Sequence, residues 1–179
     1  MGGIDIARDS IAAKNIIGFV PDNHELYDTL KGTEYLSFVG KMYGVSNKLL
    51  VERTEKYADM FKMTNELGNY SHGMKQKLMI IAALAHEPKV WILDEPLTGL
   101  DPQSAYQLKT AMRAHADEGN TVFFSSHVID VVEKVCDRIA IIDKGRIVAV
   151  DTLDNIRRNP DTSLEEIFLS ATAADNGND

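Results

Sequence analysis

Apolar and polar residues follow two patterns along the chain, and each pattern predicts a different kind of element. Short apolar runs predict strands at 16–20, 90–94 and 121–126, of which the first reads as buried. Apolar residues at helical spacing predict helices at 33–43, 46–63, 74–86 and 103–117. Ser46 is expected to cap the second of these helices, and the third is expected to stop before Pro88.

The order of these elements predicts an α/β fold built on a parallel sheet. Strands that alternate with helices through short links favour parallel pairing and right-handed crossovers. The segment 32–68 reads as an all-helical insert between the strand-bearing parts of the chain. A parallel sheet collects functional side chains at the carboxyl ends of its strands.

The last third of the chain predicts smaller elements. A helix is expected at 129–136, followed by a hairpin, RIAIID–KG–RIVAV, whose turn uses Gly145. A capping-box pattern at 163–166 predicts one short helix near the end. The closing stretch 171–179 is expected to be disordered, because it is short of apolar residues that could pack.

The composition is that of one globular domain and excludes several function classes. The 179 residues are 44% hydrophobic and 26% charged, which is enough for a core. A formal net charge of −8 weakly disfavours nucleic acid as a partner. Cys136 is the single cysteine, so no internal disulfide can form and a reducing compartment is expected. The longest uninterrupted apolar run, 78–85, is far short of a membrane span.

Two adjacent acids, Asp94 and Glu95, follow the apolar run VWIL. A carboxylate at a strand end can hold Mg²⁺ through its water shell. A second carboxylate one residue later points elsewhere and can orient or deprotonate an attacking water. His127 stands at the end of the next predicted strand, TVFFSS. Taken alone, the acids could merely end a strand and open a turn, and His127 could be a structural histidine.

The helix predicted at 74–86 is preceded by the sequence Tyr-Ser-His-Gly-Met, residues 70–74. The first turn of a helix presents unpaired backbone N–H groups and a partial positive charge, which favour an anion. Ser71 adds a hydroxyl donor, and Gly73 permits close approach of the backbone. The alternative is that Ser71 is only a helix cap, a role it can fill in either case.

These motifs in this order resemble those of the ATP-binding cassette (ABC) family, the nucleotide-binding domains that drive membrane transporters. Residues 70–74 resemble the signature motif, WILDEP the second Walker motif, LTGLDP the D-loop, and His127 the switch histidine. The resemblance covers roughly residues 4–150. It implies a partial P-loop NTPase (RecA-like) parallel sheet with an all-helical subdomain insert and a carboxyl-terminal hairpin. The implied boundaries are 1–22 and 71–150 for the α/β core, 23–70 for the helical subdomain, and 151–179 for terminal helices and tail.

The resemblance implies a role for each candidate residue, with ATP and Mg²⁺ as the bound groups. Glu95 would be the general base, Asp94 the magnesium-side carboxylate and His127 a contact to the γ-phosphate. Ser71 and Gly73 would close over the ATP of the partner protomer in a head-to-tail dimer. The D-loop residue Asp101 would link the two nucleotide sites across that dimer.

The chain departs from the commonest family pattern at a few positions. His72 and Met74 stand where the signature often has glycine and glutamine. Asp22 follows Pro21 where most members carry a glutamine that senses magnesium and the attacking water, and its carboxylate could substitute as a ligand. The sequences FVPD and YSHGMKQKL together resemble a bacterial branch, the ABC-2-type exporters, in which the ATPase and the membrane protein are separate chains.

A phosphate-binding loop of the form G-x-x-x-x-G-K-[ST] does not occur in the 179 residues. Glycine is followed by lysine only at Gly40-Lys41, and Tyr35 stands where the first glycine should be. The opening residues GGIDIARD resemble the stretch after the phosphate-loop helix. We therefore expect an amino-terminal truncation, through a shortened gene product, a fragment or a late start codon, rather than a genuine half-domain. Weak ATP binding, negligible hydrolysis and an aggregation-prone open sheet edge follow from this expectation.

The resemblance implies an ATPase subunit that couples nucleotide-driven closure of a homo- or heterodimer to transport by a separate multi-span membrane permease subunit. Such a subunit is cytoplasmic and peripheral to the inner face of the membrane. Tyr27, Leu30 and Phe38 of the helical insert are candidates for the docking surface, although packing within the insert explains them equally well. The alternative is a non-catalytic regulatory partner that completes a composite ATP site in trans. A family member acting on DNA or ribosomes is disfavoured, because no basic patch is present.

Overall fold

The computed structural model of the protein describes residues 2–23, 30–63, 70–157 and 162–173. The chain forms two compact units, Met1–Ser125 and Ser126–Asp179, and each is described by itself. The first unit contains α1 (Ser10–Asn15), β1 (Ile17–Val20), α2 (Gly32–Met42), α3 (Asn47–Met60), α4 (His72–Leu84), β2 (Val90–Leu93), α5 (Pro102–Asp117) and β3 (Thr121–Phe124). The second contains α6 (Ile129–Val135), β4 (Arg138–Asp143), β5 (Arg146–Thr152), α7 (Leu153–Arg157) and α8 (Leu164–Ala173).

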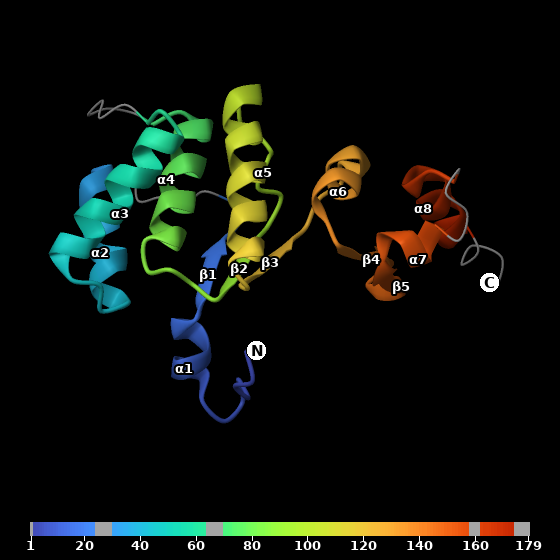
Figure 1. The fold of residues 1–179 in the computed structure, drawn as a ribbon, viewed down its shortest axis with the longest axis horizontal. Helices are drawn as coiled ribbons and strands as arrows, with labels where there is room; N and C mark the ends of the chain where they lie inside the picture. Colours follow the sequence, from blue (N-terminus) through green and yellow to red (C-terminus); the bar gives the residue numbers. More distant parts are fainter. Residues whose placement is uncertain (1, 24–29, 64–69, 158–161, 174–179) are drawn as a thin grey trace. The chain divides into compact units, whose positions relative to one another are not determined.

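The first unit is built on a three-stranded parallel sheet in the order β1-β2-β3 (Figure 1). Its register places Val20, Leu93 and Phe124 side by side at the carboxyl ends of the three strands. Helices connect the successive strands, which confirms the predicted α/β architecture with parallel pairing. The carboxyl edge of the sheet therefore gathers the residues that follow these strands, as the sequence predicted for Asp94.

One face of the sheet is closed by helices and forms the core of the unit. Trp91 and Leu93 of β2 and Val20 of β1 share this face and are almost completely buried. Helix α4 packs on β1, and α5 packs on β3. A large aromatic residue such as Trp91 contributes heavily to stability when its whole surface leaves water. This face explains why α4 and α5 hold fixed positions over the strands.

The opposite face of the sheet carries exposed apolar side chains among the described residues of the first unit. Phe19 of β1 and Phe123 of β3 lie on either side of Ile92 in the register, and they are 55% and 63% exposed. Parallel sheets are normally covered on both faces, so such a pair of phenylalanines is an apolar patch on the surface. Within the described residues β3 pairs only with β2, so its other edge carries no strand, which agrees with the expected open edge.

We expect the double substitution Phe19→Ser and Phe123→Ser to reduce binding of the apolar dye ANS by at least about two-fold, because both side chains are exposed on this face. Far-UV circular dichroism should stay unchanged. Trp91→Ser is the comparison on the covered face, where loss of the buried ring costs about 3–5 kcal/mol of stability and should not reduce dye binding. Unchanged dye binding in the double variant would show that the two phenylalanines are not the exposed patch.

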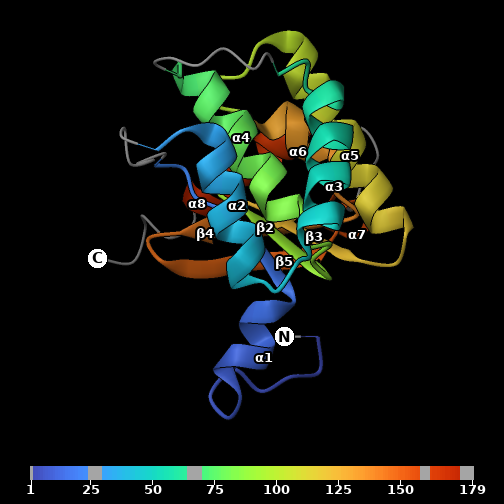
Figure 2. The same ribbon diagram turned by 90° about the vertical axis from the view of Figure 1, so that its left-hand side faces the viewer.

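The helical insert of the first unit consists of α2 and α3, which pack on each other and on α4 (Figure 2). Ser46 caps α3 by accepting a hydrogen bond from the amide of Leu49, which confirms the predicted cap. Gly40 of α2 lies against the side chain of Leu50, where a methyl group would clash, so the two helices approach closely there. Two segments of the insert, 24–29 and 64–69, lie outside the described residues, and so does the docking candidate Tyr27.

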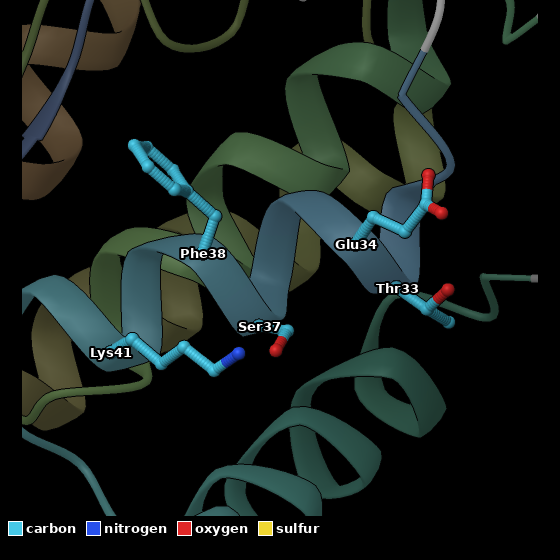
Figure 3. A pocket seen from close by; sticks show the side chains of 5 residues that line it. All are labelled: Thr33, Glu34, Ser37, Phe38 and Lys41. Atoms are coloured by element: carbon cyan, nitrogen blue, oxygen red, sulfur yellow. The ribbon is translucent and has the colours of Figure 1, made fainter.

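Helix α2 carries a small open hollow on its outer surface. Its lining residues all come from this one helix, and the hollow measures about 360 Å³ (Figure 3). They are Thr33, Glu34, Ser37, Phe38 and Lys41. Phe38 is 57% exposed, so the docking candidate on this helix is at the surface rather than in the core. Leu30, the candidate before the helix, is exposed as well.

Helix α1 is an element that the hydrophobic pattern did not predict. It begins at Ser10 and is capped by Asp9, whose side chain accepts a hydrogen bond from the amide of Ala12. Ala13 is its only buried residue, and Ile11 is exposed, so the segment has no apolar periodicity to detect. In both ribbon views α1 lies apart from α2–α5, beyond the start of β1 (Figures 1 and 2).

The second unit contains the predicted hairpin, formed by β4 and β5 as an antiparallel pair. Its turn uses Lys144 and Gly145, both at positive φ, the conformation that tight two-residue hairpin turns require. The capping box before α8 is present: the Ser163 amide donates to Glu166, and the Glu166 amide donates to Ser163 Oγ. Across the described residues of both units, no helix combines the length and the apolar character needed to cross a membrane.

Glu133 of α6 holds the helices of the second unit together. Its carboxylate accepts one hydrogen bond from the Leu164 amide and one from the Arg157 guanidinium, each at 2.9 Å. The bond from the Leu164 amide is the main cause of a lowered pKa at Glu133, and the bond from Arg157 adds to it. One carboxylate thus links α6 to α7 and to the start of α8.

Candidate functional site

The two acids after β2 are tied to the end of β3 by one serine. The Ser125 hydroxyl donates to Asp94 Oδ1, and the backbone amide of Glu95 donates to Ser125 Oγ at 3.0 Å. These contacts follow from the parallel register, which pairs Leu93 with Phe124 and so brings residues 94 and 125 together. Ser125 was not among the predicted site residues, although it stands in the TVFFSS run at the end of the neighbouring predicted strand.

Glu95 adopts a left-handed backbone conformation with φ +44°. A residue with a side chain pays about 1–2 kcal/mol for this conformation, so its neighbours must hold it there. The bond from the Glu95 amide to Ser125 and the bond from the Thr98 amide to the Glu95 carbonyl do so. Glu95 is half-buried while Asp94 is exposed, so the two adjacent carboxylates occupy different environments. In this arrangement the exposed Asp94 carboxylate could bind a hydrated metal ion, and the half-buried Glu95 carboxylate could bind a water molecule.

The oxygen atoms at this point suit Mg²⁺. Asp94 and the Ser125 hydroxyl are hard oxygen ligands, and Mg²⁺ binds few protein ligands while it keeps several waters. Among the described residues no three His, Cys, Asp or Glu side chains converge into a metal cluster. Asp22 follows β1 at the same carboxyl edge of the sheet, where the Asp94 amide donates to Val20 of that strand. Asp94 could therefore bind Mg²⁺ together with oxygens supplied by water or by a phosphate group.

Ser71 is the cap of α4. Its side-chain oxygen accepts a hydrogen bond from the amide of Met74, so this serine does act as a helix cap. Accepting that bond leaves the hydroxyl proton able to point outward toward an anion. The side chain is exposed, and the first turn of α4 contains no acidic residue. The amino end of α4 therefore keeps the positive character that favours a phosphate.

Gly73 has a local structural reason to be a glycine. A Cβ atom there would lie 2.9 Å from the carbonyl oxygen of Gly99, which is closer than such contacts allow. Gly99 itself has φ +76°, and a Cβ atom there would collide with the ring of His72. The first turn of α4 and the loop after β2 therefore lie in direct contact. His72 lies against this loop, in the position where the family's signature often has glycine.

Asp101 caps α5, and both of its carboxylate oxygens have partners within the chain. The Ser104 amide donates to Oδ1 at 2.9 Å, and the Ser104 hydroxyl donates to Oδ2. Lys77 of α4 forms an ion pair with Oδ2 at 3.2 Å. These bonds hold the pKa of Asp101 well below its usual value, with Ser104 as the larger cause and Lys77 as the smaller. The Asp-Pro-x-Ser pattern at residues 101–104 is the signal that predicts such a cap.

We expect Ser104→Ala to raise the pKa of the Asp101 carboxyl toward its ordinary value, and Lys77→Gln to raise it less. Because the pKa of Asp101 is depressed in the folded protein, its contribution to stability is present above the ordinary pKa. That contribution is lost as the pH falls through the lowered value. Carbon-13 NMR titration of the carboxyl group measures both shifts. A larger rise in Lys77→Gln than in Ser104→Ala would contradict the assigned order of causes.

His127 belongs to the second unit, where it lies two residues before α6 and is exposed. The other predicted site residues, Asp22, Ser71, Gly73, Asp94, Glu95 and Asp101, belong to the first unit. Within that unit the structure brings together Asp94, Glu95 and Ser125, and separately the start of α4 with the loop that ends at Asp101. The catalytic assignment of these residues remains a prediction.

A parallel sheet with helices between its strands, acids at a strand end and a serine-capped helix beside the following loop define an α/β domain of the P-loop NTPase class. A solved structure described as the ATP-binding subunit of an ABC transporter superposes with a TM-score of 0.89 and is 31% identical. The match covers 96% of this chain and 75% of that chain. The family model described as ABC transporter matches residues 2–98. The chain belongs to the ABC transporter family.

Curated relatives agree with this assignment. The ABC-type transporter ATP-binding protein EcsA of Bacillus subtilis (strain 168) is 30% identical over the whole of this chain, which covers 75% of that protein. The linearmycin resistance ATP-binding protein LnrL of the same organism is 36% identical over 92% of this chain, which covers 55% of that protein. The chain spans about half the length of several curated relatives it matches.

Proposed function

We propose that this chain is the ATP-binding and ATP-hydrolysing part of an ABC transporter subunit that drives a separate membrane protein. The observation that carries the proposal is the Ser125 bridge, which holds Asp94 and Glu95 at the carboxyl end of β2 with their backbone directions fixed. Membership of the ABC family supports ATP as the nucleotide. The contact between α4 and the loop after β2 supports a site shared between two protomers.

Each acid has a separate task in this proposal. Glu95 accepts a proton from the attacking water, because its left-handed backbone turns it away from its neighbour. Asp94, oriented by Ser125, holds the bound Mg²⁺, and Asp22 at the end of β1 is a further ligand. The metal, when bound, neutralises charge on the phosphate oxygens. His127 contacts the terminal phosphate.

The partners follow from the same reading. Two such domains pair head to tail, as a homo- or heterodimer, so that Ser71 and Gly73 of one protomer face the nucleotide held by the other. Asp101 lies on the connection between these two sites. The exposed side chains of α2, Phe38 among them, provide the surface for a multi-span membrane permease subunit. This places the chain in the cytoplasm, against the inner face of the membrane, with no nucleic acid as a partner.

The proposal is tested with a chimera in which the amino-terminal segment of a relative that carries G-x-x-x-x-G-K-[ST] precedes the 179 residues. Mg-ATP turnover should appear in the chimera and should be lost in its Glu95→Gln variant, which keeps the size of the side chain and removes the base. Turnover that persists in the Glu95→Gln chimera would reject Glu95 as the base, and a chimera that binds ATP without hydrolysing it would reject the proposed function.

A second function is a non-catalytic module that completes a nucleotide site of another protomer. The observation that favours it is the intact and exposed Ser71 at the head of α4. Such a module needs only the face it offers to its partner. An experiment in which the chain supplies Ser71 to a second protomer tests whether it can complete a site in this way.

A further inference from the structure

The loop that follows β2 is attached to the first turns of α4 by two side chains, those of Gln76 and Lys77. Gln76 Nε2 donates to the carbonyl oxygen of Pro96 at 2.9 Å. Lys77 Nζ lies 3.2 Å from Asp101 Oδ2, and its side chain is only 15% exposed. One turn earlier on the same side of α4 lies the contact between two glycine backbones described above. Helix α4 therefore contacts the segment after β2 at three points, at Pro96, at Gly99 and at Asp101.

Gln76 lowers the stability of the fold if its only role is to fill space. Its side chain is completely buried, and its amide oxygen Oε1 has no hydrogen-bond partner within the described part of the chain. A buried amide oxygen without a partner lowers stability, so an apolar side chain of similar size would fill the same space at less cost. What only the glutamine supplies is the N–H donor to Pro96. That donor acts on the turn that begins with Glu95, since Pro96 is the next residue.

We propose that Gln76 and Lys77 are positioning residues that hold the loop 95–100 on α4, so that the amino end of α4 and the Glu95 carboxylate move as one body. The part played by Glu95 rests on the proposed function, whereas the attachment itself does not. In the proposed head-to-tail dimer, the amino end of α4 contacts the nucleotide held by the partner protomer, whereas Glu95 acts on the nucleotide held by its own protomer. The attachment therefore couples the two nucleotide sites through the interior of one protomer.

The attachment is tested by hydrogen–deuterium exchange of individual amides, read by NMR on the 179-residue chain. Gln76→Met keeps the length of the side chain and removes the donor. The amides of Thr98 and Leu100 bond within the loop, to the carbonyls of residues 95 and 97, and report its order. We expect their protection to fall at least about five-fold in Gln76→Met, while that of Trp91 in β2 is unchanged.

Gln107→Met is the matched control. Gln107 lies on α5, and its amide oxygen is also buried without a partner in the described part of the chain. The same chemical change is made there, and the protection of Thr98 and Leu100 should stay as in the wild type. Equal loosening of the loop by Gln107→Met and Gln76→Met would overturn the proposal. Unchanged protection in Gln76→Met would overturn it as well.

Gln76→Glu provides the conservative rescue and a second route if Gln76→Met does not fold. A protonated carboxyl group donates a hydrogen bond to Pro96 as the amide does, and an ionised one cannot. Because position 76 is completely buried, the pKa of the new carboxyl group is raised. Protection of Thr98 and Leu100 should match the wild type below that pKa and fall as the pH rises through it, a pH dependence that the wild type lacks. Failure of acid to restore it would overturn the proposal.

The chimera adds a kinetic readout. Gln76→Met should lower kcat about ten-fold with little change in KM for ATP, because the loop is loosened and the nucleotide contacts are kept. A proportionate rise of KM with unchanged kcat would overturn the positioning role. If the chimera without substitutions shows no turnover, the proposed function fails, and the exchange experiment still decides the attachment.

Discussion

The 179-residue chain is expected to turn over Mg-ATP at least about 1,000-fold more slowly than the chimera that supplies a phosphate-binding segment. Asp94 and Glu95 are held in place, but no G-x-x-x-x-G-K-[ST] run occurs among these residues. In P-loop enzymes the backbone amides and the lysine of that run hold the β- and γ-phosphates. Positioning of a bound reactant supplies about 7–11 kcal/mol of rate acceleration, so acids without a held phosphate accelerate little.

Phosphate release at saturating Mg-ATP measures this difference, and a fluorescent ATP analogue measures binding separately. Glu95→Gln is the control in both proteins. In the chimera it should abolish turnover, and in the 179-residue chain it should change nothing, because any residual release there does not come from this site. Turnover by the 179-residue chain that disappears in Glu95→Gln would contradict the expectation and show that these residues hold ATP by other means.

The elements that local pattern determines were predicted well from the sequence. Helices α2 to α5 carry apolar residues at helical spacing, and strands β1 to β3 lie in short apolar runs. The short helix α1 has a single buried residue, Ala13, so no periodicity marks it. Its signal is the cap at Asp9, which is too common a residue to predict a helix unaided. Helix α1 therefore escaped prediction because it is stabilised by local capping rather than by burial.

Contacts between elements that lie far apart in the sequence were the part of the site that could not be predicted. Ser125 reaches Asp94 only because β2 and β3 pair in a particular register, and register is a property of the folded sheet. Gln76 reaches Pro96 only because α4 packs over the loop. The sequence suggested that Gly73 allows a phosphate to approach, whereas the structure shows a second reason, the backbone of Gly99. Motif spacing placed the acids, and tertiary packing supplied the residues that orient them.

Ser71→Ala is expected to remove the ability of the 179-residue chain to restore turnover in another protomer. The assay mixes the chain with a chimera that itself carries Ser71→Ala, so the only intact Ser71 hydroxyl comes from the 179-residue chain. A hydrogen bond from this hydroxyl to a charged phosphate contributes about 1.5–3 kcal/mol. We therefore expect the wild-type chain to raise turnover about ten-fold or more above the chimera alone, and the Ser71→Ala chain to raise it not at all.

Loss of the phosphate contact must be separated from loss of a helix cap, because Ser71 also caps α4. Ser46 caps α3 in the same way, accepting from the amide of Leu49 as Ser71 accepts from that of Met74. Either Ser→Ala change costs about 1 kcal/mol of stability, so Ser46→Ala reproduces that cost away from the site. The Ser46→Ala chain should restore turnover as the wild type does. If the Ser71→Ala chain restores it too, the hydroxyl serves α4 alone and the nucleotide lies elsewhere.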